Sequence, residues 1–162
     1  MCILLADFLR DTLRLGASTA ISLADELSLA ERYLNIQRVR LGPRLEVTVD
    51  AEAGATACRV PPLLLQPVIE NAIVHGVTHL IEGGAVRISA VRHEKMLRVS
   101  VTNPCDAERP KSTGTGLGLE LLKSRLHAEF GSEARAHAVE TPGQFEVTIE
   151  MPAVTDEVDR TR

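Results

Sequence analysis

Aromatic side chains and basic clusters are scarce in this chain of 162 residues. It has no tryptophan, and its few aromatic residues lie far apart in sequence, at Phe8, Tyr33, Phe130 and Phe145, so stacking platforms for bases or sugars are nearly excluded. Eighteen Lys and Arg residues against 22 Asp and Glu residues give a net charge of -4, and no run of basic residues is suited to a polyphosphate backbone. We therefore expect no nucleic-acid partner.

Cysteine pairs and long apolar runs are also missing. The three cysteines, Cys2, Cys58 and Cys105, are widely spaced and include no C-x-x-C pair, so the sequence indicates neither a disulfide framework nor a zinc site. No apolar run approaches the roughly 20 residues of a membrane span, and the start MCILLADFLRD turns acidic too early for a signal peptide. We expect a cytoplasmic chain, either free or as the cytoplasmic part of a membrane-anchored protein.

What the chain does contain is an ordinary globular balance, with 44% apolar and 25% charged residues. Apolar residues recur at helical spacing through residues 3–15, and this first helix is expected to end near Gly16. A second helix is predicted over residues 22–42. It begins with a capping pattern from Ser22 to Asp25 and Glu26, it ends at Gly42 and Pro43, and its apolar face is predicted to comprise Leu23, Leu27, Ala30, Leu34 and Val39.

After the second helix the pattern becomes mixed. Strands and helices are predicted in the order strand, helix, two strands, helix, two strands, at residues 44–50, 61–77, 85–92, 97–103, 117–131, 134–140 and 143–152. This order predicts an α+β fold with one mostly antiparallel sheet and helices on one face. We expect a helical segment at residues 1–41, an α+β domain at 42–152 and a frayed tail at 153–162.

Three glycines at alternate positions, Gly114, Gly116 and Gly118, come directly before a predicted helix. A dinucleotide-binding fingerprint needs a glycine where Leu119 stands and a strand just before the glycines, and neither is present; a P-loop is excluded because the chain has no G-K-[ST]. The glycines favour a flexible loop whose N–H groups converge at a helix N-terminus, a site suited to phosphates. The alternative is a glycine-rich turn without a ligand.

A second candidate group lies in QPVIENAIVHG, residues 66–76. On a helical projection Asn71 and His75 lie one turn apart, on the flank of an apolar face formed by Leu65, Val68, Ile69 and Ala72. The Asn71 amide oxygen suits Mg²⁺, a hard cation that takes oxygen ligands and shares them with phosphates. The alternative is that Asn71 is a cap or a satisfied core amide and His75 a packed helix-end histidine. Pro67 belongs either to the first helical turn or to a kink.

Together these motifs resemble the ATP-binding domain of sensor histidine kinases, and in particular the LytS-like class. Members of that class carry Q-P-x-x-E-N-A-x-x-H-G and G-x-G-[IL]-G-L before an R-L helix, and this chain has LLLQPVIENAIVHG at 63–76 and GTGLGL at 114–119. Residues 22–42 resemble the stretch that in this class joins the phosphoacceptor helices to the catalytic domain. The resemblance covers residues 20 to 152 and implies a Bergerat-type ATP-binding fold, a two-layer α/β sandwich preceded by a helical segment.

The resemblance also implies ATP and Mg²⁺ as ligands. Asn71 would hold the Mg²⁺ that bridges the ATP phosphates, and His75 would line the pocket beside them. Gly114, Gly116 and Gly118 would let the loop approach the phosphates, and the donors would be the backbone N–H groups of Thr115, Gly116, Leu117, Gly118 and Leu119. Residues 104–113 would form a lid over the nucleotide.

Two positions depart from the class. Asn103 stands where many histidine kinases have an Asp, so the contact to the adenine amino group would be made by an uncharged side-chain oxygen. Val74 stands where the class often has a phosphate-facing Lys, and Lys111 in the lid is the residue that could replace that cation.

The third departure concerns the phosphoacceptor. The histidines of this chain are His75, His79, His93, His127 and His137, and none lies in the N-terminal helical segment. We expect a fragment that binds ATP and transfers the γ-phosphoryl group to a histidine outside this chain. The implied partners are the phosphoacceptor-helix segment of the parent kinase and a response regulator, with a homodimer in the intact protein. The apolar stripe of residues 3–15 is expected to pack into a dimeric helical bundle there, and in this chain it either folds back or pairs two copies.

Two other functions remain open on the same fold. One is a catalytically weak, nucleotide-gated module that docks on a partner kinase or response regulator. The other is an anti-sigma-type serine protein kinase, because a fold does not fix the acceptor.

Overall fold

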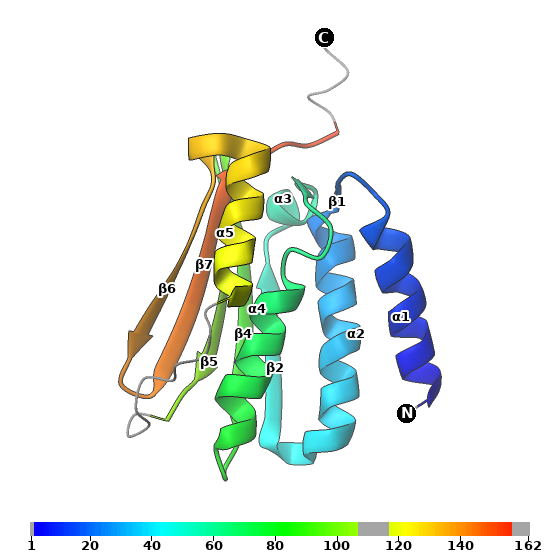
Figure 1. Cartoon of the computed structure of the whole chain (residues 1–162), viewed down its shortest axis with the longest axis vertical. Helices are drawn as coiled ribbons and strands as arrows, with labels where there is room; N and C mark the ends of the chain where they lie inside the picture. The colour runs from blue at the N-terminus through cyan, green and yellow to red at the C-terminus, as the bar shows by residue number, and fades with distance from the viewer. Residues whose placement is uncertain (1, 107–116, 157–162) are drawn as a thin grey trace.

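The computed structural model describes residues 2–106 and 117–156, and its centre is a five-stranded sheet (Figure 1). The strands follow the order β2-β4-β5-β7-β6, with the bounds β2 (Leu45–Ala51), β4 (Gly84–His93), β5 (Met96–Pro104), β6 (Arg135–Thr141) and β7 (Gln144–Pro152). β2 runs parallel to β4, and the remaining neighbours are antiparallel. The predicted α+β class with a mostly antiparallel sheet is confirmed.

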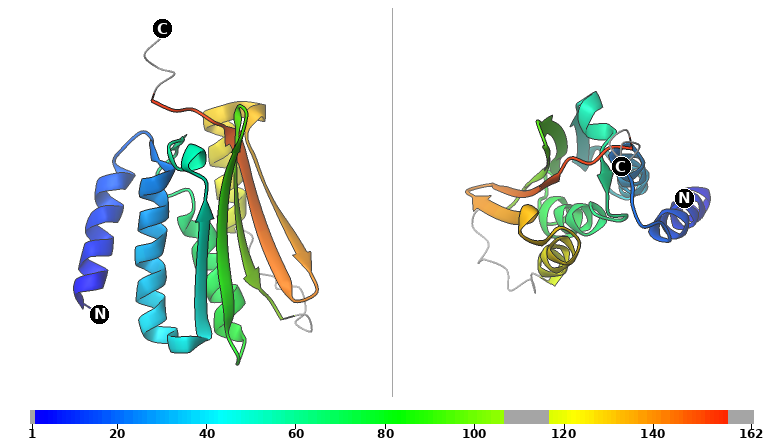
Figure 2. Two further views of the ribbon diagram at one scale, coloured as in Figure 1. Left: turned by 180° about the vertical axis from the view of Figure 1, so that it is seen from behind. Right: turned by 90° about the horizontal axis from the view of Figure 1, so that it is seen from above.

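The main helices form the second layer, on one side of the sheet (Figure 2). They are α1 (Cys2–Gly16), α2 (Leu23–Leu41), α4 (Gln66–Asn71) and α5 (Leu117–Phe130), and α1 is the outermost, packed against α2. Successive side chains of a strand point to opposite faces, so alternate residues of β4 and β5 meet the helices. Those that are buried in this way are Val86, Ile88, Ala90, Leu97, Val99 and Val101. Across the described residues, no helix combines the length and apolar character needed to cross a bilayer.

The second predicted helix agrees with α2 at both ends. Ser22 is the N-cap, and its Oγ accepts a hydrogen bond of 3.1 Å from the Asp25 N–H. The prediction for Val39 is wrong, because this side chain is 57% exposed whereas Leu29 and Leu41 are buried. Helix α2 is covered by α1 on one side and by the sheet on another, so its buried surface is wider than a single stripe.

The helix predicted over residues 61–77 is shorter in the structure. The chain stays irregular up to Leu65, because Pro61 and Pro62 have no N–H to donate and Leu63 adopts a left-handed φ of 59°. Helix α4 begins at Gln66 with Pro67 in its first turn, which settles the position of that proline.

Helix α4 does not continue as a regular helix beyond Asn71. A π-helical turn, η2 (Ala72–Gly76), and a 3₁₀ turn, η3 (Val77–His79), follow it without a break. π-helical turns of this kind are frequent at functional sites.

Several short elements have too few residues for a periodic pattern and were not predicted. A small antiparallel pair joins β1 (Ile21–Ser22) to β3 (Arg59–Val60), and α3 (Ala53–Thr56), η1 (Gly42–Arg44) and η4 (Gly131–Glu133) are single turns. The start of the predicted tail lies against β3, where the Arg59 N–H donates to the Val154 carbonyl at 2.7 Å.

Candidate functional site

The candidate site is built on α4 and η2. Their apolar face is buried as predicted, with Val68 5% exposed and Ile69 and Ala72 fully buried, and this packing fixes the rotation of the segment. Asn71 is then half-buried and His75 exposed. The residues between them form a π-helical turn, whereas the helical projection of residues 66–76 assumes a regular α-helix.

The Asn71 carboxamide is free of hydrogen bonds to the part of the chain that the structure describes. It makes no capping bond at the start of η2, and within the described residues its side chain has no hydrogen-bonding partner. The amide oxygen of a half-buried residue that binds no donor among the described residues fits a hard cation, and Mg²⁺ is bound through few protein ligands when phosphates supply the others. Among the described residues there is no cluster of three or more His, Cys, Asp or Glu side chains that could cage a metal.

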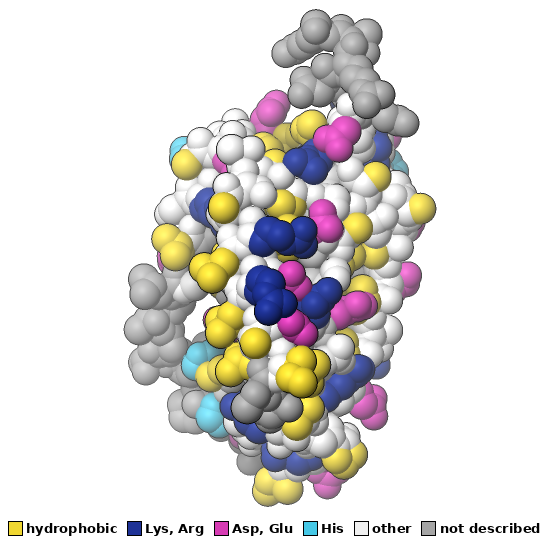
Figure 3. All heavy atoms as spheres, turned by 90° about the vertical axis from the view of Figure 1, so that its right-hand side faces the viewer, with side chains coloured by type: hydrophobic (Ala, Val, Ile, Leu, Met, Phe, Trp, Pro, Cys, Tyr) yellow, Lys and Arg dark blue, Asp and Glu magenta, His cyan; other side chains and the backbone are white. Residues whose placement is uncertain are grey.

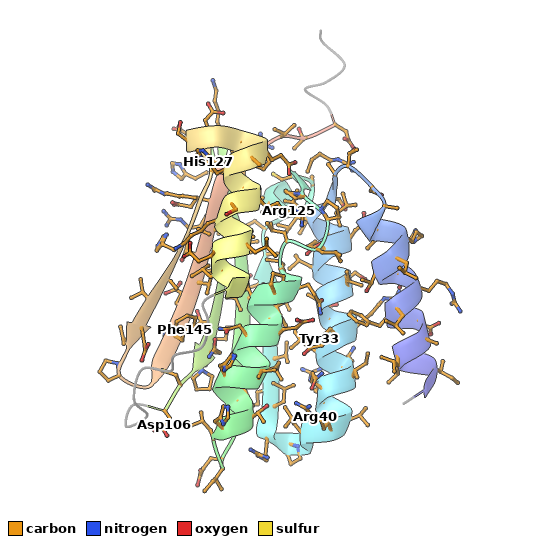
Figure 4. All side chains as sticks on the ribbon, viewed as in Figure 1. Tyr33, Arg40, Asp106, Arg125, His127 and Phe145 are labelled. Carbon is orange, nitrogen blue, oxygen red and sulfur yellow. The ribbon has the colours of Figure 1, made fainter. Side chains whose placement is uncertain are left out.

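Asn103 lies near the end of β5, with its side chain on the face that meets the helices. It is 4% exposed, and its Nδ2 donates to the Pro104 carbonyl at 2.9 Å. The Oδ1 atom is therefore the one left to accept a hydrogen bond from a ligand. Figure 4 labels two residues at this end of the sheet. They are Phe145, which is the register partner of Asn103 on β7, and Asp106, which follows β5.

Gly76 brings η2 into direct contact with the end of β5. A Cβ atom at this position would lie 2.4 Å from Asn103 Nδ2 and 2.8 Å from the Pro104 carbonyl oxygen, so only glycine allows the approach. A Cβ on Gly84 would likewise lie 2.4 Å from Pro104 Cγ. Gly76 was not singled out from the sequence, although it is the last residue of the Q-P-x-x-E-N-A-x-x-H-G match.

The first turn of α5 meets the other end of α4. A Cβ on Gly118 would lie 3.8 Å from Pro67 Cβ, an ordinary van der Waals distance, and the two helices are in contact. Leu117 and Leu119 belong to the same turn, where the first backbone N–H groups of a helix have no intrahelical partner. Lys111, Gly114, Thr115 and Gly116 lie outside the described residues, as does the predicted lid beyond Asp106.

The structure thus brings three separately predicted segments together along α4 and η2. Asn71 and His75 are carried by this segment, Asn103 contacts its last residue, and the turn that contains Gly118 contacts its first turn. Val74, on η2, is 47% exposed and supplies no charge where the class often has a Lys.

Glu26 is a buried acidic residue whose burial the capping pattern does not predict. The predicted capping pattern holds for Asp25, whose N–H donates to Ser22 Oγ, whereas the Glu26 side chain is 1% exposed and accepts hydrogen bonds from the N–H groups of Leu63 and Leu65, in the loop before α4. Burial raises the pKa of Glu26, and those N–H donors partly oppose the rise. The available signal was its spacing, because Glu26 lies beside Leu27 and one turn before Ala30 on the apolar face.

Comparison with known proteins identifies the family. A family model for histidine kinases matches residues 1–45. The sensor histidine kinase BtsS of Escherichia coli K12 is 31% identical over 149 residues, which is 91% of this chain and 26% of BtsS. The sensor protein LytS of Enterococcus faecalis is 30% identical over 169 residues, covering 96% of this chain and 28% of LytS. The chain spans about a quarter of the length of these relatives.

Solved structures agree on the fold. The catalytic domain of the histidine kinase ThkA, in a nucleotide-free form, superposes with a TM-score of 0.61 at 16% identity and covers 85% of this chain and 98% of that domain. At this identity the likeness concerns the fold, and the predicted two-layer arrangement with an N-terminal helical segment is confirmed. The chain belongs to the sensor histidine kinases, in the group that includes LytS, and it has the fold of their catalytic domains.

Proposed function

We propose that this chain is the ATP-binding catalytic domain of a two-component sensor histidine kinase. It transfers the γ-phosphoryl group of ATP to an imidazole nitrogen of a histidine outside this chain and releases ADP. The observation that carries the proposal is that α4 and η2, which hold Asn71, contact both Asn103 and the first turn of α5. Asn71 and the first turn of α5 belong to segments that match the family's motifs, and Asn103 stands where many histidine kinases have an Asp.

Asn71 is the proposed ligand of a Mg²⁺ ion shared with the ATP phosphates, and the lack of a donor to its amide oxygen among the described residues supports this role. Bound Mg²⁺ would neutralise phosphate charge and help to orient the γ-phosphoryl group. His75, exposed on η2, lines the phosphate side of the site. The Asn103 Oδ1 accepts a hydrogen bond from the adenine amino group, since its Nδ2 is already bound to Pro104.

The glycine-rich loop is proposed to bind the phosphates. Gly114, Gly116 and Gly118 let the loop approach them, and the donors are the backbone N–H groups of Thr115, Gly116, Leu117, Gly118 and Leu119. The last three residues form the first turn of α5, the end of a helix where anions are favoured. Lys111, in the lid at 104–113, supplies the cation that Val74 lacks. The chain's own contribution is then to hold ATP in position and to neutralise its charge, while the nucleophile comes from elsewhere.

The proposed organisation follows from this role. Residues 1–41 join the domain to the phosphoacceptor helices, residues 42–152 form the catalytic unit, and residues 153–162 are a tail. The partners are the phosphoacceptor-helix segment of the parent kinase and a response regulator, in the cytoplasm. A homodimer forms through α1, where Ile3 and Leu13 are 77% and 76% exposed.

A second candidate function rests on the two neutral positions of the site. With the uncharged Asn103 and the apolar Val74, the domain would bind nucleotide and dock on a partner kinase or response regulator without transferring phosphate.

A phosphotransfer assay tests the first proposal. The chain is incubated with γ-labelled ATP, Mg²⁺ and a separate phosphoacceptor-helix protein of this class. We expect acid-labile label on the acceptor, a loss of labelling with Asn71→Ala, and normal labelling with the control Asn35→Ala, which removes the same kind of side chain from an exposed position on α2.

Each other outcome rejects part of the proposal. Stable label on this chain alone would show that the acceptor is not outside it. Acid-stable label on a partner serine would favour the serine kinase, and ATP binding without any transfer would favour the docking module.

A further inference from the structure

Glu26 is a buried carboxylate that the proposed chemistry does not use. It lies in the first turn of α2 and is 1% exposed, although glutamate is almost never fully buried unless its charge is satisfied. Both of its oxygens are engaged, since Oε1 accepts from the Leu65 N–H at 2.7 Å and Oε2 from the Leu63 N–H at 2.9 Å. Hydrogen bonds to a charged group are the stronger kind.

The two amides belong to the loop that leads directly into α4. Leu63 is held at a left-handed φ of 59°, a conformation that costs energy for a residue with a side chain. Leu65 immediately precedes Gln66, and its carbonyl accepts the Ile69 N–H at 2.9 Å. Leu65 therefore binds the Glu26 carboxylate through its N–H and supports the first turn of α4 through its carbonyl.

Other contacts tie the start of α2 to the same segment. The Leu23 N–H donates to the Cys58 carbonyl at 2.8 Å, and β1 pairs with β3 through Ile21 and Val60. The end of α1 is close as well, because a Cβ on Gly16 would lie 3.4 Å from Leu63 Cδ1. The turn between α1 and α2 and the loop before α4 thus form one joint, with the Glu26 carboxylate in it.

We propose that Glu26 is a positioning residue, which sets the position of α4, and through it that of Asn71, relative to α2. This rests on the proposed function, in which Asn71 binds Mg²⁺-ATP. Asn71 is the last residue of α4, a short helix whose start is held by the loop that Glu26 binds. A movement of the N-terminal helical segment would therefore be transmitted through the Glu26 carboxylate and the loop at Leu63 and Leu65 to Asn71.

The carboxylate has a property that glutamine lacks. It offers two acceptor oxygens and no donor, whereas a glutamine amide offers one acceptor and an NH₂ group that would face an N–H donor. Glu26→Gln therefore breaks one of the two loop bonds at nearly constant volume. Glu26→Asp keeps the carboxylate on a shorter side chain, and it serves as the second variant where the Gln variant does not fold. Leu34→Ala is the control, because it removes a side chain of α2 that is 1% exposed and has no polar group.

The experiment compares hydrogen exchange and Mg²⁺-ATP binding of the full chain at a temperature where every variant is folded. We expect Glu26→Gln to speed exchange at Leu63, Leu65 and residues 66–76 while β4 and β5 stay protected, and to weaken Mg²⁺-ATP binding about tenfold. Leu34→Ala should lower the thermal midpoint at least as much and yet leave the Kd within about twofold of the wild type.

The proposal is overturned if Glu26→Gln shows wild-type protection in α4 and a wild-type Kd, or if Leu34→Ala weakens binding equally, since the effect would then be one of general stability. Failure of the wild type itself to bind Mg²⁺-ATP would reject the proposed function instead. In that event the exchange at residues 66–76 still decides whether Glu26 positions α4.

Discussion

At the scale of single residues, two carboxylates of this chain respond to their surroundings in opposite ways. Burial raises the pKa of Glu26. Glu150, on the face of the sheet away from the helices, accepts hydrogen bonds from Arg135 Nε and from Arg98 Nε and Nη2, and these bonds hold its pKa below the ordinary value. The two residues therefore contribute opposite slopes to the dependence of stability on pH.

Glu150→Gln should reduce stability at neutral pH and have little effect in acid. Because the folded pKa of Glu150 is lowered, its contribution to the free energy of unfolding is present above the ordinary Glu value of 4.5 and is lost as pH falls through the folded pKa. Urea unfolding of wild type and variant between neutral and acidic pH measures the difference. A difference that grows toward acid would contradict this assignment.

Gly76→Ala should damage both stability and nucleotide binding. The added Cβ meets Asn103 and the Pro104 carbonyl, and an overpacked contact of this kind costs about 1–3 kcal/mol. Urea unfolding and ATP titration report the two effects. Gly54→Ala is the matched control, because its Cβ would be 3.9 Å from Arg92 in the single turn of α3, where alanine is the better helix former. Equal losses in both variants would show that the contact at Asn103 has no special role.

The residue types of the site could be predicted from sequence, but their surroundings could not. Asn71 falls in a family-like motif, and Asn103 ends a predicted strand at the position where many histidine kinases have an Asp. The burial of Asn103 and the close approach of Gly76 to it depend on how η2 packs against β5. These two elements are distant in sequence, so no local pattern predicts the contact. The burial of Glu26 could not be predicted, because a carboxylate in the first turn of a helix usually caps that helix in solvent. Here the loop before α4 folds over the carboxylate.

At the scale of elements, the long strands and helices were predictable because their periodicity is clear. β4 and β5 match the alternating pattern, and α5 ends at Phe130, just before Gly131 with its φ of 59°. The start of α4 was placed too early because the apolar run at 61–65 fits a helix, whereas two prolines and the Glu26 bonds hold it as a loop. β1 and β3 are defined only by their pairing.

Helix α1 presents an apolar stripe that the sheet does not cover. Figure 3 views the molecule from the α1 side, where hydrophobic side chains lie exposed beside a band of charged ones. Leu9 is 51% exposed, whereas the neighbouring Phe8 packs against Tyr33 of α2, with ring centroids 5.8 Å apart. Contiguous apolar surface of this kind is typical of an interface.

Sedimentation at several concentrations tests whether α1 pairs two copies. We expect the average mass to rise with concentration and Leu13→Glu to suppress the rise, because it places a charge in the stripe. Ile81→Glu is the control, since Ile81 is 92% exposed but lies outside α1. A wild type that stays monomeric, or an equal effect of both variants, would reject pairing through this helix.

At the scale of the whole molecule, the helical segment and the sheet share one core. Leu27 and Leu34 of α2 are buried in the same cluster as Ile69 of α4 and Val99 of β5. The segment that resembles a linker is therefore packed onto the domain that it would control, and Glu26 lies where the two meet. The fold class was predictable from the order of elements, whereas this joint was not, because it is made by short pairings and a single side chain.

The most direct test of the account is calorimetric titration of Mg²⁺-ATP into the chain, with Asn71→Ala and Asn35→Ala measured alongside. We predict binding that requires Mg²⁺, is lost in Asn71→Ala and is retained in Asn35→Ala, because Asn71 lies on the segment of α4 and η2 that contacts Asn103 at one end and the start of α5 at the other, whereas Asn35 lies on α2. No binding by the wild type at millimolar Mg²⁺-ATP, or unchanged binding by Asn71→Ala, would contradict the assignment of this site.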